Sequence, residues 1–476
     1  MTRSIPVPLW LLVLVLLLAA WTLLDRLLIP TVRWYLKRRV QRVIDGLNRR
    51  LEIKIQPFKL TKRQVLIDRL VFDPQVMEAA DAHAQAEGMP RKIAQATVER
   101  YAQEIVPAFN AYIYFQLGYW LARRVAQLLY RVRLGFADEE GLARIPSNST
   151  VVFLMNHRSN MDYLLVSYMV AGRSALSYAV GEWARIWPLE TLIRSMGAYF
   201  VRRRSRNALY RRVLQRYVQM ATAAGVTQAV YPEGGLSRDG LLRPPKLGLL
   251  DYMLRDFDPK KDRDIVFIPV GINYDRTLED RTLLLDLTPA AERKGVLGGA
   301  ATALRFVGHN LSLMVQRRWH RFGYACVNLG TPISMARYLE EHQVSLQGLE
   351  APERFEHIAK IGEDLMARIG RVVPVLPVSV VATVFAHQPD LPRGELEVKA
   401  AAFEVIRSLE SAGAKVYIPR ESEDYSIEVG LRALRKRRLV EEVDGRLQAR
   451  VEELPVLEYY ANSIRHLLPG GSPAAL

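Results

Sequence analysis

An alternation of short β-prone runs with longer helical segments begins near residue 150 and constrains the fold more than any other feature. This rhythm is typical of an α/β layer in which helices connect the strands. It predicts a mixed sheet flanked by helices over residues 144–373. The expected strands are Thr150–Met155, Ala198–Val201, Thr227–Tyr231, Ile265–Gly271 and Ala325–Leu329, and the expected helices are Leu164–Val170, Ser205–Ala224, Lys246–Phe257 and Pro352–Ile369.

The regions on either side of this layer have helical patterns. From residue 30 to about residue 143, apolar positions recur at threes and fours with arginines between them. The aromatic stretch Ala108–Val125 suits a core helix or a membrane interface, and core is the simpler interpretation. Beyond residue 374 the chain becomes helical again, and the pattern of Arg432–Val451 predicts a basic helix followed by a β-hairpin. The pair Asp444 and Gly445 favours a type I′ turn there.

The amino terminus carries a nearly unbroken apolar run, Ile5–Leu24, which is long enough to cross a bilayer. A cleaved signal peptide and a buried helix are the alternatives, but Ala19–Trp21 makes a poor cleavage site. Only Arg3 precedes the run, whereas many basic residues follow it, so the positive-inside rule places the rest of the chain in the cytoplasm. Residues 1–29 are therefore expected to be a transmembrane helix.

Composition limits the classes of partner. The chain has 476 residues, 66 Lys and Arg against 50 Asp and Glu, and a net charge of +16. That charge attracts anions, so nucleic acid, an acidic lipid surface and a phosphorylated metabolite all remain possible. Cys326 is the only cysteine, which excludes an intramolecular disulfide and a cysteine metal cluster and fits a reducing compartment.

The first polar cluster, Asn156–Asp162, follows the strand predicted at Thr150–Met155. His157 and Asp162 are five residues apart, which on one helix of about 3.6 residues per turn would separate them by about 140°. They can meet only if His157 lies in the loop and Asp162 in the first helical turn. A carboxylate on one ring nitrogen leaves the other nitrogen as a base for an alcohol proton. Such a pair can also be purely structural.

A second cluster, Gly197–Arg204, ends in three consecutive arginines. Guanidinium groups bind phosphate oxygens bidentately, so Arg202, Arg203 and Arg204 at a strand end are candidate phosphate ligands. A solvated basic turn is the alternative.

The third cluster, Tyr231–Gly240, places glycines and the carboxylate of Glu233 after another strand, where open α/β sheets bind ligands. Lys246 lies close enough downstream to add positive charge. The fourth cluster, Ile268–Asp275, includes Pro269 and is expected to form a wall of the site more than to supply chemistry.

Together, the order and spacing of the clusters are more specific than any one of them. The chain resembles the bacterial membrane-bound glycerol-3-phosphate 1-O-acyltransferases, whose four blocks appear here as NHRSNMD, GAYFVRRR, YPEGGLSRDG and IPVGINYD. The likeness extends to Asn48–Leu70 and Leu457–Leu468, and so covers most of the chain from about residue 48. It implies a glycerolipid acyltransferase domain. The expected division is a transmembrane anchor at 1–29, a helical region at 30–143, the acyltransferase domain at 144–373 and a helical region with a hairpin at 374–476.

The resemblance also implies a role for each matching position. His157 would be the general base and Asp162 its orienting partner. Leu236 stands where an arginine is common in the family, which leaves Arg243 or Lys246 to compensate. The implied ligands of glycerol 3-phosphate are Arg203, Glu233, Gly234, Ser237 and Arg238, with Arg202, Arg204 and Lys246 as further candidates.

The expected reaction is direct attack of the sn-1 hydroxyl of glycerol 3-phosphate on an acyl thioester, carried by CoA or by acyl carrier protein, without an acyl-enzyme. The sequence has no G-x-S-x-G elbow and no metal-ligand pattern such as H-E-x-x-H, so neither a serine hydrolase nor a zinc enzyme is supported. No cofactor or metal is expected. The acyl chain needs an apolar tunnel, although core packing explains the candidates nearly as well. These candidates are Trp183, Trp187, Ile193 and Met196.

The sequence also permits three other interpretations. The nearest is acylation of lysophosphatidic acid or dihydroxyacetone phosphate. A membrane-tethered nucleic-acid-binding protein is suggested by the Arg432–Val451 hairpin, but acidic residues interleave with its arginines. The intact His157 and Asp162 argue against an inactive scaffold. We expect the protein in the bacterial inner membrane with its catalytic domain facing the cytoplasm, in contact with glycerol 3-phosphate, an acyl carrier and membrane lipid, and not with nucleic acid.

Overall fold

A computed structural model describes residues 53–170, 174–181, 189–202, 205, 207–285 and 321–471. Contacts divide the chain into Met1–Lys54 and Ile55–Leu476, and the second unit contains all the elements discussed below. The anchor predicted at residues 1–29 lies outside the described residues. Within them, no helix combines the length and the apolar character needed to span a bilayer.

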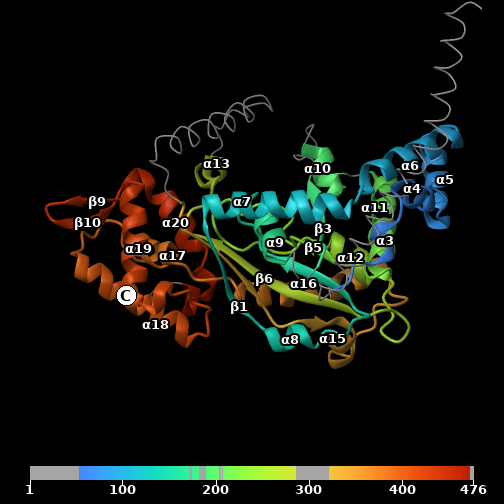
Figure 1. Cartoon of the computed structure of the whole chain (residues 1–476). Coiled ribbons are helices and arrows are strands. Elements are labelled where there is room, and N and C mark those ends of the chain that lie inside the picture. Colours follow the sequence, from blue (N-terminus) through green and yellow to red (C-terminus); the bar gives the residue numbers. More distant parts are fainter. Residues whose placement is uncertain are drawn as a thin grey trace, which may run out of the picture. The chain divides into compact units, whose positions relative to one another are not determined.

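The centre of the protein is a mixed sheet flanked by helices, as predicted, and eight of its strands lie in the described residues (Figure 1). Its main path runs β1-β7-β6-β2-β5-β3-β4, with β8 paired to β6. Neighbouring strands are parallel except where β7 and β8 run antiparallel to β6. The strands are β1 Arg131–Ala137, β2 Thr150–Met155, β3 Ser177–Gly181, β4 Tyr199–Val201, β5 Gln228–Val230, β6 Ile265–Tyr274, β7 Tyr324–Leu329 and β8 Ile333–Ser334.

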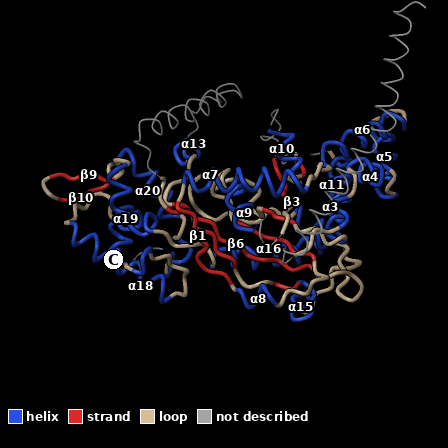
Figure 2. The backbone as a smooth tube through the Cα atoms, in the orientation of Figure 1, coloured by secondary structure: helices blue, strands red, loops and turns tan. Residues whose placement is uncertain are grey.

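The central strands are buried along their whole length, which explains why they read as continuous apolar runs. Every residue of β2, β5, β6 and β7 is buried, as expected for strands covered on both faces. All five predicted strands are present, and β6 extends three residues beyond the predicted end at Gly271. Figure 2 shows these strands running together with helices around them.

The predicted helices of the α/β layer are also present. In Figure 1, α7 and α9 lie along one side of the sheet and α15 lies beyond the opposite side. A large core cluster joins the sheet to the surrounding helices. The helices of this layer are α8 Glu139–Ala143, α9 Asp162–Val170, α10 Leu189–Ser195, α11 Ala208–Ala223, α12 Gly248–Leu254, α13 Asp280–Leu285, α15 Met335–Glu341 and α16 Ala351–Arg371.

The region before residue 144 is mostly helical, but the prediction is wrong at its end. Arg131–Ala137 forms β1, an edge strand paired with β7. Its side chains are mostly exposed and alternate arginines with apolar residues, so the segment resembled the arginine-bearing helices before it. The helices here are α3 Pro57–Leu60, α4 Arg63–Val71, α5 Pro74–Ala86, α6 Arg91–Ile105 and α7 Tyr119–Leu129, with a π-helical stretch η2 Ile113–Gly118.

The aromatic stretch Ala108–Val125 is only partly core. Tyr114, Ala122 and other small or aromatic residues of η2 and α7 are buried. The opposite face exposes large apolar side chains, so the core interpretation holds for one face only. The exposed members are Tyr112, Leu117, Trp120 and, in the last turn of α7, Leu128.

The carboxyl-terminal region has its own core, built around the buried helix α17. The predicted hairpin is confirmed: β9 and β10 are antiparallel, and Asp444 and Gly445 both have the positive φ angles, 50° and 74°, that a type I′ turn requires. The further elements are α17 Pro377–His387, α18 Glu395–Ser411, α19 Glu423–Lys436, β9 Val440–Val443, β10 Arg446–Ala449 and α20 Leu454–Asn462.

Candidate active site

His157 and Asp162 meet as the spacing predicted. His157 lies in the loop after β2 and Asp162 is the first residue of α9. The His157 Nδ1 and Asp162 Oδ2 atoms are 2.9 Å apart, and both side chains are almost fully buried. The neighbouring Asn156 fixes the start of the loop, because its amide exchanges two hydrogen bonds with the backbone of Ile272 in β6.

Asp162 is held by several donors besides the histidine. Its Oδ2 accepts hydrogen bonds from the backbone N–H groups of Arg158, at 2.7 Å, and Ser159, at 3.1 Å. Its Oδ1 accepts one from the Tyr274 hydroxyl at 2.6 Å. A carboxylate held in this way accepts the Nδ1–H of His157, which leaves Nε2 as the free base.

Glu233 braces the loop that carries His157. One carboxyl oxygen accepts the His157 N–H at 2.9 Å, and the other accepts the Arg243 N–H at 3.0 Å. Burial raises the pKa of Glu233 to about 7, against the opposing effect of these two hydrogen bonds and of the Arg158 charge. Both oxygens are therefore engaged within the protein, and the predicted contact of Glu233 with substrate remains a prediction.

Ser237 ties the same two loops together. Its N–H donates to the His157 carbonyl at 2.9 Å, and its hydroxyl donates to the Leu241 carbonyl at 2.7 Å. The predicted ligand Ser237 is thus buried and bonded within the protein. Arg238 beside it is half-buried.

The carboxyl-terminal helix α20 packs against the loops that carry Arg158 and Gly240. Arg158 donates to the Gly240 carbonyl at 2.6 Å and lies 4.7 Å from the centre of the Tyr459 ring. Gly240 has a φ of +90°, and a Cβ there would lie 2.1 Å from the Tyr459 carbonyl oxygen, so only glycine fits. Leu236, in the place of the expected arginine, packs against the carboxyl-terminal core.

Two tyrosine rings pack against the imidazole. Tyr231 stacks on His157 with ring centres 4.0 Å apart, and Tyr163 approaches edge-on at 5.6 Å. Both tyrosines also line a cavity of about 570 Å³ beside the ends of β3, β4 and β5. His157 is not among the described residues that line it, so the two rings separate the base from the cavity.

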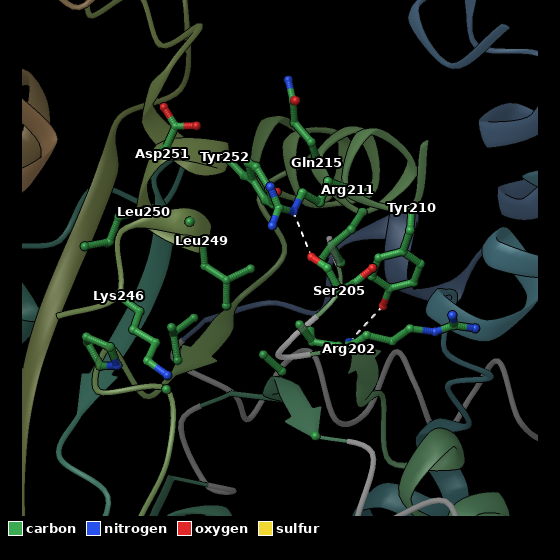
Figure 3. Close-up of a pocket in the computed structure, with 18 of the residues that line it drawn as sticks. Arg202, Ser205, Tyr210, Arg211, Gln215, Lys246, Leu249, Leu250, Asp251 and Tyr252 are labelled. Carbon is green, nitrogen blue, oxygen red and sulfur yellow. Dashed lines mark hydrogen bonds between the residues drawn. The ribbon is translucent and has the colours of Figure 1, made fainter. Parts of the chain in front are cut away.

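The cavity brings together some of the predicted ligands (Figure 3). Gly234 and Lys246 lie together at one end. Gly234 has a φ of +67°, and a Cβ on it would lie 2.6 Å from the Lys246 side chain. Lys246 is exposed and has no carboxylate within ion-pair distance among the described residues. Among these residues it is therefore a cation with no competing internal partner.

Arg202 also lines the cavity but is already paired. Its guanidinium makes two hydrogen bonds to the buried Glu104, at 2.8 and 2.6 Å, and this contact raises the pKa of Arg202. Figure 3 shows the guanidinium pointing away from Lys246. The structure therefore does not support Arg202 as a phosphate ligand, because the ligand would compete with Glu104.

The remaining predicted positions either do not line the cavity or lie outside the described residues. Ile193, Met196 and Pro269 are described but do not line the cavity; Met196 packs against Gly118, and Pro269 lies inside β6 opposite Leu154. Four further predictions, Arg203, Arg204, Trp183 and Trp187, lie outside the described residues.

The sequence interpretation missed several residues at the site. Tyr231 and Tyr274 stood inside the third and fourth blocks, and their position at the end of a strand was a usable signal. Three cations that line the cavity carried no such signal: Arg211 and Arg212 of α11, and Arg255 directly after α12. No group of three His, Cys, Asp or Glu side chains suited to a metal ion occurs in the part of the chain that the structure describes.

Comparison with known families gives two matches. Residues 137–273 match the family described as Acyltransferase, and residues 310–472 match the Glycerol-3-phosphate acyltransferase C-terminal region. The first match contains the His157 loop, Glu233 and all but the last residue of β6; the second contains α20 and its contacts to that loop.

Several curated proteins named glycerol-3-phosphate acyltransferase are similar to this chain. The glycerol-3-phosphate acyltransferase of Aeromonas hydrophila subsp. hydrophila is 28% identical over 421 residues, 86% of this chain and 50% of that protein. That of Pseudomonas fluorescens (strain SBW25) is 28% identical over 360 residues, 72% of this chain and 41% of that protein. The chain thus spans about half the length of the curated relatives it matches.

A solved structure is also similar in part. The 1-acyl-sn-glycerophosphate (LPA) acyltransferase PlsC from Thermotoga maritima is 18% identical, and the match covers 53% of this chain and 78% of that one. The TM-score is 0.30, which does not establish a common fold.

Proposed function

Because the chain belongs to the bacterial glycerol-3-phosphate acyltransferase family, we propose that it transfers a fatty acyl group from a thioester carrier to the sn-1 hydroxyl of glycerol 3-phosphate. The product is lysophosphatidic acid, so the reaction is the first acylation of phospholipid synthesis. The observation that carries the proposal is the buried His157–Asp162 pair, held beside a cavity that Lys246 lines without a carboxylate partner among the described residues.

The proposed chemistry needs one base and no covalent intermediate. His157 Nε2 takes the proton of the acceptor hydroxyl as its oxygen attacks the thioester carbonyl carbon. The tetrahedral oxyanion collapses, the carbon–sulfur bond breaks, and the carrier thiolate takes the proton back from the imidazolium. Asp162 stabilises the imidazolium between these steps.

Access to the base requires a local rearrangement. The His157 side chain is 1% exposed and lies behind the Tyr231 and Tyr163 rings. On this proposal the acceptor hydroxyl reaches Nε2 only when the Tyr231 ring shifts. The Tyr231 hydroxyl is buried without a hydrogen-bond partner among the described residues, so no hydrogen bond opposes that shift.

Lys246 is proposed to bind the phosphate of the acceptor. Its ammonium is a point charge suited to phosphate, and the turn at Gly234 allows it to lie close to the backbone. Arg238 and Arg243 lie on the same segment and are proposed to complete the anion site, with Arg203 and Arg204 as further candidates.

The protein is proposed to act at the bacterial inner membrane, from its cytoplasmic side. Support comes from the apolar run at residues 5–24 and from the exposed face of η2 and α7, where Trp120 lies beside Arg123 and Arg124. Aromatic and basic side chains together favour an anionic lipid interface. The acyl donor is proposed to be acyl-CoA or acyl-acyl-carrier protein, and no cofactor is proposed.

The rival from another class, nucleic-acid binding through the hairpin, is weakened by ion pairs. Arg435 pairs with Glu442 at 2.7 Å, and Arg450 lies 3.5 Å from Glu441. Arginines neutralised in this way do not form the uniformly basic patch that duplex binding needs.

The test measures carrier thiol released from palmitoyl-CoA and from palmitoyl-acyl-carrier protein by the full-length protein in detergent. Thiol release should require glycerol 3-phosphate, yield lysophosphatidic acid and fall at least about 10²-fold in His157→Ala. Release that instead requires lysophosphatidic acid or dihydroxyacetone phosphate would reassign the acceptor. Undiminished release in His157→Ala would reject His157 as the base.

A further inference from the structure

We propose that Tyr274 is a positioning residue for this reaction, whose hydroxyl holds the second carboxylate oxygen of Asp162 and thereby sets the orientation and proton affinity of His157. The inference rests on the proposed acyl transfer. It extends the pair His157–Asp162 to a chain of three side chains in which a phenol supports the carboxylate.

The two oxygens of Asp162 are held in different ways. Oδ2 receives its hydrogen bonds from the loop that Asp162 itself closes, namely from the ring of His157 and the N–H groups of Arg158 and Ser159. Oδ1 receives the Tyr274 hydroxyl at 2.6 Å, from a residue 112 positions later in the chain. The contact with Tyr274 therefore fixes the carboxylate relative to the sheet, and not only relative to its own loop.

Tyr274 is well placed to act as a rigid support. It is the last residue of β6, and its own N–H donates to the side chain of Asn273, which in turn donates to the Pro374 carbonyl and to Ser463. The next residue, Asp275, accepts the Tyr324 and Val378 N–H groups. The backbone is thus anchored on both sides of the tyrosine, which leaves its hydroxyl little freedom to move away.

The phenol is a permanent donor in this environment. The ring is buried, and burial raises the pKa of Tyr274 well above its ordinary value, an effect that the negative charge of Asp162 adds to. A hydrogen bond to a buried charge contributes more than one between neutral groups.

Simple core packing is the competing explanation, and the protein contains a matched control for it. The Tyr130 ring lies 5.2 Å from the Tyr274 ring and is equally buried. Its hydroxyl donates to the backbone carbonyl of Arg276 at 2.8 Å and does not contact Asp162. Removing each hydroxyl in turn separates an effect on Asp162 from an effect on packing.

The experiment compares Tyr274→Phe with Tyr130→Phe in the full-length protein, using thiol release from palmitoyl-CoA. Tyr274→Phe should lower kcat by about 10- to 100-fold, the effect of losing a hydrogen bond to a charged group, and change the KM for glycerol 3-phosphate by less than about twofold. Tyr130→Phe should change kcat by less than about threefold.

The pH profile gives a readout that packing would not move. Without the phenol the carboxylate attracts protons more strongly, so the His157–Asp162 pair takes up its extra proton at higher pH. The acid limb of the kcat profile should therefore move up by about one pH unit in Tyr274→Phe only. The other charged groups facing this loop, Glu233, Glu279 and Arg158, are unchanged in both variants.

A third readout does not depend on activity. The His157 Nδ1–H proton, bonded to a buried carboxylate, should give a low-field NMR resonance that is absent in His157→Ala. This resonance should shift in Tyr274→Phe and stay in place in Tyr130→Phe. Equal behaviour of the two variants in kcat, pH profile and resonance would overturn the proposal. If the wild-type protein releases no thiol, the proposed function fails, while the resonance still decides whether Tyr274 sets the state of the pair.

Discussion

The two sides of the site differ in how far the protein completes them by itself. On the proton-transfer side, Asp162 is fully buried and accepts hydrogen bonds from His157, Tyr274 and the loop backbone. On the anion side, Lys246 is exposed and has no carboxylate partner among the described residues. The difference teaches that the geometry of proton transfer is set before substrate arrives, whereas the charge of the anion site is left for the ligand to balance.

Arg202 lies on the anion side of the site but is already bonded within the protein. It lines the same cavity as Lys246, yet its guanidinium is committed to Glu104. A cation with an internal carboxylate partner contributes to stability, and a cation without one is available to a ligand. Single substitutions can therefore test the two sides of the site separately.

The largest effect is expected for Asp162→Asn. An amide cannot stabilise the imidazolium and can favour the wrong tautomer of His157, so kcat should fall by about 10³-fold with little change in KM. Asp280→Asn is the matched control, because Asp280 is also buried and accepts hydrogen bonds from Arg437 and Tyr460 but lies outside the pair. Similar kcat losses in both variants would show that burial, and not the pair, carries the effect.

A second prediction concerns stability on the anion side. Arg202→Met leaves the buried carboxylate of Glu104 without its bidentate partner and should lower the free energy of unfolding by about 3 kcal/mol. The KM for glycerol 3-phosphate should change little. Thermal unfolding of Arg202→Met beside the double variant Glu104→Gln/Arg202→Met measures this, since the double variant should recover part of the loss. A large rise in KM with unchanged stability would return Arg202 to the phosphate site.

Lys246→Met tests whether the exposed cation on the anion side binds phosphate. Loss of a charge-assisted contact to phosphate should raise the KM for glycerol 3-phosphate by about 10- to 100-fold. Stability should be nearly unchanged, because this exposed lysine has no carboxylate partner among the described residues. Steady-state kinetics at fixed palmitoyl-CoA give the result, and Lys246→Arg should retain most of the affinity. A fall in kcat at constant KM would place Lys246 on the proton-transfer side instead.

The smallest effect is a pH dependence of stability that comes from Glu233. Burial raises its folded pKa to about 7, above the ordinary value of 4.5. The folded state therefore holds the proton more tightly than the unfolded state. The resulting stability is complete below about pH 4.5 and is lost as pH rises through about 7, an effect of about 1–3 kcal/mol.

The measurement is the unfolding midpoint between pH 4.5 and 8. Glu233→Gln should flatten the upper part of this dependence. Asp275, whose pKa burial raises to about 6, should still contribute to the lower part. A midpoint that rises with pH over this range in the wild-type protein, and not in Glu233→Gln, would contradict the assigned sign.

Much of the fold could be predicted because its signals are local. The buried strands β2, β5, β6 and β7 read as apolar runs, and the Asp444–Gly445 turn needs only residues that tolerate positive φ. β1 was missed for the opposite reason. β1 is an exposed edge strand held by its backbone pairing with β7, and that pairing leaves no apolar pattern in its own sequence.

In the candidate site, too, local contacts could be predicted from the sequence and long-range contacts could not. The pairing of His157 with Asp162 was predictable because both belong to one loop and one helical turn. The assignment of Arg202 as a phosphate ligand was not supported, because its partner Glu104 lies 98 positions away on α6. The contacts of Arg158 with Gly240 and Tyr459 likewise join three distant segments.

By itself the sequence determined which residue types stand at the strand ends, and so the class of chemistry that this chain can perform. Only the tertiary structure decided which of those residues are free to meet a ligand and which are already bonded to the protein. The physical reason is that a side chain's availability depends on long-range partners, as Tyr274 for Asp162 and Glu104 for Arg202 demonstrate. Local spacing contains no information about those partners.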